Sequence, residues 1–530
     1  MKLFESTWRD GYEYYERYYD DQLNRSIKRR VDLPCEWYEP SSRGLYTYIL
    51  DKTIKLEKKQ GRAKEGRDSY GFLDPMYRNI RDNYWNKNAY NLNPRIWALD
   101  IETRSTNGFP VPEKADQTIT LIQIYDNKLD TMFVFGLRDW KHQSDYSFSY
   151  KVEYIKCNDE IELLDSFLDL FKKLDPLMIF GWYTRGFDYP YIHNRLKNLG
   201  MDVNRLSNYG KVSYSEHEFQ GKQEFSFTSD GHFFLDLQEV YQNFIKAPRP
   251  SYSLDAIAEI DLKENKVKHS EYNAFDDFYT GKYIIPDNPT EEQKNSKIYQ
   301  AAIAGDLEEV KELSHSEFVY YGITDTYLVK RIEENKNLAA LMIMISEKMG
   351  VQISDSMGTV KPWSQYILNK SMLNNQVMPP KQEHGNPTVV GGFVRDSIKG
   401  KHRWVISADV NSMYPLLGMT GFNMSPETFI PIHKLPGDLR DLVLTYFNDQ
   451  DELRRLNMDK EIWDEVTELI TKYNYSLGIN GAVFDKSKLG MIPEMVLEIY
   501  ASRKKDKKTQ FKYEQQKVLI KHIQKERKNG

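Results

Sequence analysis

The sequence predicts a multidomain protein of the α/β class, and three observations lead to this prediction. The chain has 530 residues, which at roughly 150 residues per domain suggests about three or four domains. From about residue 95 onward, short apolar segments alternate with turn residues, as in a meander of strands. An amphipathic helix and a further buried strand follow, which is the order expected of a mixed sheet covered by helices.

The composition excludes several classes of protein. Apolar residues make up 40% and charged residues 28% of the chain, which is unlike a disordered or a membrane protein. No run of about 18 apolar residues occurs, and the N-terminus lacks the apolar core of a signal peptide. The two cysteines are too few for a disulfide framework or a zinc cluster. We therefore expect a soluble cytoplasmic protein with no membrane partner.

The elements expected along the chain follow from periodicity. Strands over 95–102, 119–124 and 132–135 would form an antiparallel meander, and apolar spacing over 161–174 predicts a helix that Pro176 ends. A buried strand over 177–180, a helix over 192–199, a hairpin over 210–236 and a helix over 317–338 follow. Two more strands are expected over 389–394 and 404–409.

The last segment reads as one long helix over 494–528, roughly 50 Å at about 1.5 Å per residue. Its apolar face is dense at first and thin later, so we expect it to project from its base. From Ala501 to Gly530 there are eleven Lys and Arg residues against three Asp and Glu. Such a basic run is by itself most often only a solvated face.

One set of acidic residues suggests a metal site. Asp100 and Glu102 lie at i and i+2 of a strand and so on one face, where they repel each other unless a cation neutralises them. Asp188 follows a buried strand and a loop, and Tyr321 and Asp325 share one helix face at i and i+4. Oxygen ligands of this kind favour a hard divalent cation. The alternative without a metal site is that Asp188 caps a helix and Asp325 is a surface acid.

The order of these residues resembles the three exonuclease motifs of the proofreading domain of family B DNA polymerases. The resemblance implies a ribonuclease H-like domain with 3′–5′ exonuclease activity and two Mg²⁺ ions per active site, with Mn²⁺ able to substitute. It implies that Asp100 bridges the ions, that Glu102 and Asp325 hold the ion on the nucleophile side, and that Asp188 serves the other. Tyr321 would orient the attacking water.

The chain departs from the family in one place within these motifs. Tyr183 stands five residues before Asp188, where the family usually has Asn. In relatives that position contacts the primer strand, so the departure affects strand binding and removes no metal ligand.

A second resemblance lies near residue 410. Ser407–Pro415 resembles polymerase motif A, which implies that Asp409 holds the metal ions of a nucleotidyl transfer site. By the same resemblance, deoxyribonucleoside triphosphates would be bound by Ser412, Met413, Tyr414, Arg503 and Lys507. Gly391 and Gly392 resemble the turn that contacts template phosphate in the family, a close approach that glycine permits. The alternative for Tyr414 is a core aromatic beside a strand.

The resemblance runs from about residue 95 to 510 and is strongest to polymerases of T-even-like bacteriophages. It implies an N-terminal domain (1–95), an exonuclease domain (96–345), a return segment of the N-terminal domain (346–385), a partial palm (386–490) and a first fingers helix (491–530). The chain lacks the motifs of the returning fingers helix and of the second palm acids, as well as a thumb.

Three functions remain in view from the sequence. The first is the N-terminal subunit of a split replicative DNA polymerase, completed by a second polypeptide and acting on primer-template and single-stranded DNA in a phage-infected host cytoplasm. A sliding clamp would be reached through that second polypeptide. The second is a stand-alone 3′–5′ exonuclease with a vestigial palm, and the third is a non-enzymatic nucleic-acid-binding protein. A truncated form of a longer polymerase would look like the first.

Overall fold

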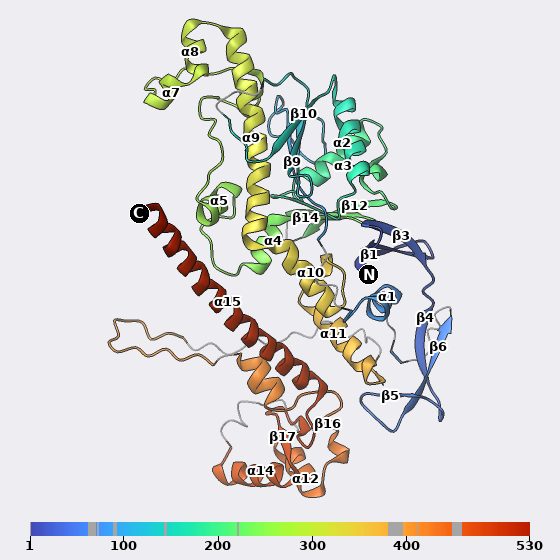
Figure 1. Ribbon diagram of the computed structural model, residues 1–530. Helices are drawn as coiled ribbons and strands as arrows, with labels where there is room; N and C mark the ends of the chain where they lie inside the picture. Colours follow the sequence, from blue (N-terminus) through green and yellow to red (C-terminus); the bar gives the residue numbers. More distant parts are fainter. Residues whose placement is uncertain are drawn as a thin grey trace. The chain divides into compact units, whose positions relative to one another are not determined.

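The computed structural model describes residues 2–61, 70–71, 74–87, 93–141, 146–219, 222–379, 396–410, 412–447 and 458–529. The chain divides into two compact units, and each is built from two stretches of sequence (Figure 1). The first unit comprises Met1–Leu33 and Pro75–Tyr366, and the second comprises Pro34–Asp74 and Ile367–Gly530. No helix of the described residues combines the length and the apolar character needed to cross a membrane.

The centre of the first unit is a six-stranded mixed sheet in the order β10-β9-β8-β7-β11-β14. Strands β7, β8 and β9 pair antiparallel, whereas β10 runs parallel to β9 and β11 runs parallel to both β7 and β14. The expected meander and the mixed α/β fold are therefore confirmed. The strands are β7 (Ile96–Thr103), β8 (Ile119–Asp126), β9 (Thr131–Gly136), β10 (Lys151–Lys156), β11 (Met178–Gly181) and β14 (Phe233–Asp236).

The two faces of this sheet carry separate apolar cores, because successive side chains of a strand point to opposite faces. Trp97, Leu99 and Ile101 of β7 pack with helices α2 (Glu160–Leu174) and α3 (Asp188–Asn198). Ala98 belongs to the other core, which includes helix α9 (Leu307–Lys336). Figure 1 shows α9 on one side of the strands and α2 and α3 on the other. The alternation places residues 100 and 102 on the α9 side.

Local signals set the ends of the helices. The Asp159 side chain accepts a hydrogen bond from the Glu162 N–H and begins α2, and Asp175 ends it in the left-handed region at φ 53°. Asp306 caps α9 in the same way, and Asn337 ends it at φ 53°. The helix predicted over 161–174 is confirmed. The helix predicted over 317–338 is longer than expected, because it begins at the Asp306 cap.

The remaining elements of the first unit surround this sheet. A three-stranded antiparallel sheet of β1, β2 and β3 packs with α1, and β12 and β13 form the hairpin expected after residue 210. Their bounds are β1 (Lys2–Asp10), β2 (Glu13–Asp20), β3 (Arg25–Val31), α1 (Pro75–Asn83), η1 (Val203–Leu206), β12 (Val212–Phe219), β13 (Lys222–Ser229), α4 (Leu237–Phe244), α5 (Leu254–Leu262), α6 (Phe275–Thr280), α7 (Glu291–Asn295), α8 (Lys297–Ala304), α10 (Leu338–Met349) and η2 (Ser354–Met357).

The second unit holds two small sheets, of order β15-β5-β6-β4 and β16-β18-β17, and ends in the long helix α15 (Met491–Asn529). The helix predicted over 494–528 is thus confirmed. The other elements are β4 (Cys35–Pro40), β5 (Tyr46–Tyr48), β6 (Lys55–Gly61), β15 (Gln376–Val377), η3 (Met413–Thr420), β16 (Phe429–Ile430), η4 (Ile432–Lys434), α12 (Gly437–Tyr446), α14 (Lys460–Tyr473), β17 (Tyr475–Leu477) and β18 (Val483–Asp485); helix α11 (Val360–Leu373) contains the boundary between the units.

One predicted strand is wrong. Residues 404–409 join no sheet within the described chain, and Trp404 and Ile406 are 97% and 92% exposed. A strand needs a partner for its ladder of hydrogen bonds, and no other described strand supplies one to this segment. The strand predicted over 389–394 lies outside the described residues.

Candidate active site

The first two acids lie on the α9 face of strand β7. Asp100 pairs across the sheet with Gln123 of β8, and Glu102 pairs with Leu121, a residue of the α9-side core. Glu102 is buried and Asp100 is half-buried. The strand that the sequence predicts therefore delivers two carboxylates to one place, as the i, i+2 spacing requires.

Asp188 reaches the same region from the loop after β11, the strand beside β7. It is the first residue of α3, and its Oδ1 accepts a hydrogen bond from the backbone N–H of Ile101 at 3.2 Å. Ile101 stands between Asp100 and Glu102 in the sequence, so that bond holds the Asp188 carboxylate near both acids of β7. The partial positive charge of a helix N-terminus also favours a carboxylate at this position.

The loop that carries Asp188 is held by a second acid. Asp236, at the end of β14, accepts hydrogen bonds from the backbone N–H groups of Tyr183 and Arg185, both at 3.1 Å, and also caps α4. Tyr183 adopts the left-handed conformation at φ 62° and is exposed. Asn accepts that conformation more readily than Tyr does, so the departure from the family motif falls at a backbone position that suits Asn.

Helix α9 completes the group with Tyr321 and Asp325, one turn apart and both buried against the sheet. Lys266 lies between them: its Nζ is 2.5 Å from Asp325 Oδ2 and 5.0 Å from the centre of the Tyr321 ring. The other carboxylate oxygen, Asp325 Oδ1, is buried without a hydrogen-bond partner. Lys266 therefore places a cation beside Asp325 and near Asp100 and Glu102.

The pKa values of these groups follow from burial and mutual repulsion. Burial raises the pKa of Asp100 well above its ordinary value, and the charges of Asp188, Glu102 and Asp325 raise it further. Burial followed by the charge of Asp325 does the same for the pKa of Glu102. Burial raises the pKa of Asp188 to about 7. These raised pKa values indicate that the negative charge of the site is not fully balanced by nearby cations.

Two further pKa shifts concern the groups on and beside α9. Burial raises the pKa of Tyr321, with the neighbouring Asp325 adding to the effect, so the phenol keeps its proton at neutral pH. Burial alone would lower the pKa of Lys266, but Asp325, Asp100 and Glu102 outweigh it and raise that pKa. The lysine is thus a cation held by the carboxylates.

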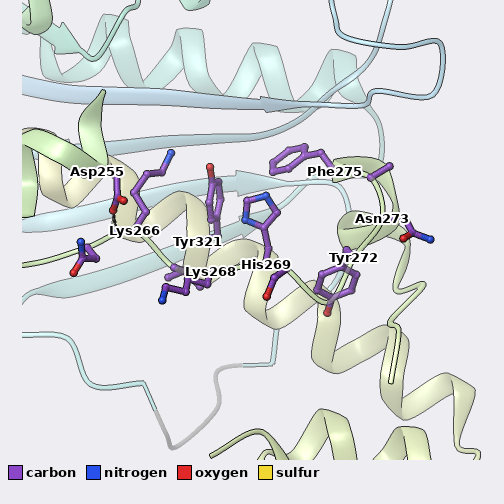
Figure 2. A pocket seen from close by; sticks show the side chains of 12 residues that line it. Asp255, Lys266, Lys268, His269, Tyr272, Asn273, Phe275 and Tyr321 are labelled. Carbon is purple, nitrogen blue, oxygen red and sulfur yellow. Dashed lines mark hydrogen bonds between the residues drawn. The ribbon is translucent and has the colours of Figure 1, made fainter. Parts of the chain in front are cut away.

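A pocket of about 810 Å³ is lined in part by Lys266 and Tyr321 (Figure 2). The segment between α5 and α6 forms most of its wall, together with Tyr321 of α9. In Figure 2, Lys266 and Tyr321 lie side by side with their polar ends pointing the same way, whereas Lys268 points away from them. The ring of His269 packs at 5.4 Å, edge to face, against that of Tyr321. The pocket wall is therefore of mixed aromatic and basic character, and it includes the lysine that pairs with Asp325.

The donor set suits a divalent cation, although the side chains are not arranged around one. Within the described part of the chain, no three His, Cys, Asp or Glu side chains are spaced to hold an ion directly. Carboxylate oxygens are nevertheless the ligands that Mg²⁺ prefers. The unpartnered Asp325 Oδ1 and the raised pKa values of Asp100 and Glu102 both indicate that more positive charge would be accommodated.

The residues predicted for the second site lie in the second unit. Asp409 is exposed in the segment that precedes η3, Ser412 adopts the left-handed conformation at φ 54°, and Met413 and Tyr414 begin η3 with exposed side chains. Arg503 and Lys507 are exposed on α15, which packs against η3 nearer its base. Gly391 and Gly392 lie outside the described residues.

Comparison with known proteins shows which family the sheet of the first unit is similar to. Residues 58–257 match the family model described as DNA polymerase family B, exonuclease domain, and this range contains Asp100, Glu102 and Asp188. This segment is similar to the exonuclease domain of family B DNA polymerases. Tyr321 and Asp325 lie beyond the matched range, on the helix that packs against the sheet of that domain.

The curated relatives agree with this assignment. The chain is 25% identical over 493 residues to the DNA-directed DNA polymerase of Escherichia phage RB69, and 24% identical over 543 residues to that of Enterobacteria phage T4. These matches cover 88% and 96% of the chain but 48% and 54% of the relatives. A DNA polymerase of Archaeoglobus fulgidus is 24% identical over 339 residues, or 63% of the chain and 34% of the relative. The chain therefore spans about half the length of the two phage polymerases.

Sequence reasoning missed two residues of the candidate site. Lys266 stands in a charged stretch between α5 and α6, and no spacing distinguishes it from its neighbours. Asp236 had a signal, because an acid directly after a short apolar strand is a common helix cap. Its additional bonds to the loop before Asp188 depend on the neighbouring strands β11 and β14 and so required the structure.

Proposed function

We propose that this chain is the proofreading part of a replicative family B DNA polymerase and removes nucleotides from the 3′ end of DNA. The observation that carries the proposal is the meeting of Asp100, Glu102, Asp188 and Asp325, which come from three distant segments of the chain. Buried carboxylates raise the free energy of the folded protein unless they are compensated. Such a cluster is therefore typical of a site that gains cations with its substrate.

Two divalent cations, when bound, would supply an activated water and stabilise charge on the phosphate. The carboxylates of Asp100, Glu102 and Asp325 would hold the ion beside the water, with Asp100 shared and Asp188 serving the second ion. Tyr321 keeps its proton at neutral pH, so its hydroxyl can donate a hydrogen bond and orient the water. Lys266 would balance the negative charge of the carboxylates and the phosphate.

The adjoining pocket supports a DNA strand as the substrate. Its volume of about 810 Å³ falls in the range of sites for small molecules and single nucleotides. Aromatic rings and cations that alternate along a wall suit unpaired bases and phosphates, because bases stack on rings and phosphates attract cations. Single-stranded 3′ ends are therefore the expected substrate.

The test follows a 5′-labelled single strand of DNA in Mg²⁺ or Mn²⁺. We expect a ladder that shortens from the 3′ end, no cleavage in EDTA, and a loss of roughly 10³-fold or more in Asp100→Ala, since metal-assisted water activation accounts for much of such a rate. A 3′-blocked strand should resist. Cleavage that survives Asp100→Ala would contradict the proposal.

A second function, half of a polymerase active site, has its own observation. The motif around Asp409 follows a segment whose Trp404, Val405 and Ile406 are 76–97% exposed. Apolar exposure of this extent marks a surface that a partner covers. We propose that the rest of a palm, on a second polypeptide in a phage-infected cytoplasm, pairs with this segment and adds a carboxylate opposite Asp409. A sliding clamp would then be reached through that polypeptide.

Primer extension tests this second function. The chain is mixed with a polypeptide that carries the missing fingers, palm and thumb motifs, and primer-template DNA and deoxyribonucleoside triphosphates are added. We expect extension only in the mixture, and none with Asp409→Ala. If the mixture does not extend the primer and exonuclease activity is intact, the chain acts as a nuclease alone.

A further inference from the structure

A buried amide of the central sheet makes no hydrogen bond that the structure shows. Gln123 of β8 is fully buried, and neither its Oε1 nor its Nε2 has a partner. Its neighbours Ile122 and Ile124 belong to the core beneath α2 and α3, so Gln123 points to the opposite face, toward α9. An unsatisfied buried amide destabilises a protein, and an apolar residue of the same size would avoid that penalty.

Gln123 stands directly across from the first acid of the site. Its Cα pairs with that of Asp100 in the β7–β8 register. Directly opposite side chains of antiparallel strands have Cβ atoms about 4.5–5.5 Å apart. A carboxamide at this position can therefore reach the carboxylate of Asp100 by a change of rotamer.

Helix α9 makes room for this amide. Gly322 follows Tyr321 on the helix, and a Cβ atom there would lie 2.0 Å from Gln123 Nε2 and 2.8 Å from its Cδ. Glycine inside a helix lowers stability relative to alanine, so a close contact gives a physical reason for it here. The amide therefore lies against the turn of α9 that carries Tyr321 and Asp325.

We propose that Gln123 is a positioning residue whose amide N–H donates to the Asp100 carboxylate and orients it when the site is loaded with divalent cations. This inference rests on the proposed exonuclease function and adds to it the residue that orients the Asp100 carboxylate. In the structure described here the amide is unpaired, and the hydrogen bond forms as Asp100 turns toward a ligand. Amide hydrogen bonds to ligating carboxylates tune metal binding in this way.

The principal test is Gln123→Met, which keeps the volume and removes the amide. We expect Mn²⁺ affinity, measured from free Mn²⁺ by electron paramagnetic resonance, to fall about 10–100-fold. The melting temperature in EDTA should equal or exceed that of the wild type, because an unpaired amide has been removed. A structural role alone would give the reverse: a lower melting temperature and unchanged Mn²⁺ affinity.

Gln117 offers a matched control in the same domain. It is also a buried glutamine, but its side chain is bonded: Oε1 accepts from the Asn107 N–H at 3.2 Å, and Nε2 donates to the Gly108 carbonyl at 3.2 Å. Gln117→Met should lower the melting temperature and leave Mn²⁺ affinity unchanged. If the two variants behave alike in either measurement, the assignment of Gln123 is wrong.

Gly322→Ala gives an independent test through the helix. The added methyl group must displace the amide, so Mn²⁺ affinity should fall as in Gln123→Met. In a Gln123→Ala background the same methyl group has space, and it should raise the melting temperature without a further loss of affinity. An equal loss of affinity in both backgrounds would overturn the proposal.

Wild-type and Asp100→Ala protein are assayed in parallel for hydrolysis and for Mn²⁺ binding, which separates the two levels of the argument. If the wild type neither hydrolyses DNA nor binds Mn²⁺, the proposed function and this inference fail together. If the wild type does both, Asp100→Ala does neither, and Gln123→Met matches the wild type, then only the role of Gln123 is refuted.

Discussion

Charge balance at single residues determines what the candidate exonuclease site can do. Four acids on one face of a sheet would repel one another strongly, and burial removes the water that would screen them. Two features reduce this repulsion. The pKa values of Asp100, Glu102 and Asp188 are raised, which favours the uncharged carboxyl groups. Lys266 supplies a positive charge beside Asp325. A bound divalent cation would replace the protons.

Lys266→Met tests the role of the lysine as a counter-ion. The Lys266 side chain is 30% exposed and the Asp325 side chain 4%, so we expect a loss of about 2 kcal/mol in unfolding free energy, less than the roughly 3–5 kcal/mol of a fully buried pair. Added Mg²⁺ should then raise the melting temperature of the variant more than that of the wild type. Urea unfolding and melting curves with and without Mg²⁺ provide both quantities.

Lys268→Met is the control for this substitution, because Lys268 lines the same pocket and points away from Lys266. It should leave both stability and the response to Mg²⁺ near wild type. An equal response to Mg²⁺ in Lys266→Met and the wild type would show that the lysine and the cation do not compete for the same carboxylates.

The dependence of stability on pH follows from Asp188. Burial raises its pKa from 3.8 to about 7, so between these values the folded protein keeps a proton that the unfolded chain has lost. The stabilising contribution of this proton is complete below pH 3.8 and is lost as pH rises to about 7, by about 4 kcal/mol at most. In urea unfolding in EDTA, the unfolding free energy of the wild type should therefore fall relative to that of Asp188→Asn as the pH rises across this range. A constant difference would contradict the raised pKa.

At the scale of elements, strands β7, β8 and β11 bring the acids together and a loop directs one of them. The alternation of β7 sends its apolar residues to one core and its acids toward α9, so a single strand both stabilises the sheet and builds the site. The loop after β11 has no such periodicity. Asp236 holds it through backbone N–H groups and thereby sets where Asp188 begins α3.

Asp236→Ala should therefore affect both stability and activity. Loss of the α4 cap alone lowers unfolding free energy by about 1 kcal/mol, and the freed loop should reduce exonuclease activity by roughly tenfold or more, since small displacements of a catalytic group have large effects. Thermal melts and the 5′-label assay measure the two effects.

Asp159→Ala is the matched control for this prediction. Asp159 caps α2 through a bond of 2.9 Å to the Glu162 N–H, and α2 packs in the core on the face of the sheet opposite to α9. We expect a similar loss of stability and full exonuclease activity. Equal activity of the two variants would show that Asp236 is only a cap.

At the scale of the whole molecule, the two units differ in how far their surfaces are covered. The first unit encloses two apolar cores on the faces of one sheet. In the second unit, every residue of α15 from 503 to 520 is exposed, including Phe511, Leu519 and Ile520. A helix without tertiary packing is only marginally stable in water, so we expect this part of α15 to be only marginally stable in the chain alone.

Hydrogen exchange should reveal that marginal stability. We expect the backbone amides of α15 beyond residue 503 to exchange rapidly in the chain alone. The backbone amides of α9, whose buried face belongs to the core of the first unit, should exchange slowly in the same sample. Addition of the polypeptide that carries the missing polymerase motifs should protect α15 and leave α9 unchanged. Protection of α15 equal to that of α9 before this addition would contradict the idea that it lacks packing partners.

Several elements could be predicted from the sequence because their signals are local. The strands around Asp100, the helix over 161–174 and the long helix α15 follow from apolar spacing and caps, which act over a few residues. The i, i+2 and i, i+4 spacings placed Asp100 with Glu102 and Tyr321 with Asp325 on shared faces. The strand expected over 404–409 was wrong, because pairing requires a second segment that local spacing does not supply.

The sequence by itself determined the candidate site residues and the elements expected to hold the four acids, since residue type and periodicity are local properties of the chain. Only the tertiary structure decided that Lys266 balances the acids, that Asp236 directs the loop before Asp188, and that Gln123 lies unpaired opposite Asp100. These relations join residues far apart in the sequence through the order of strands in the sheet. They depend on packing across that sheet, and no local pattern encodes packing of this kind.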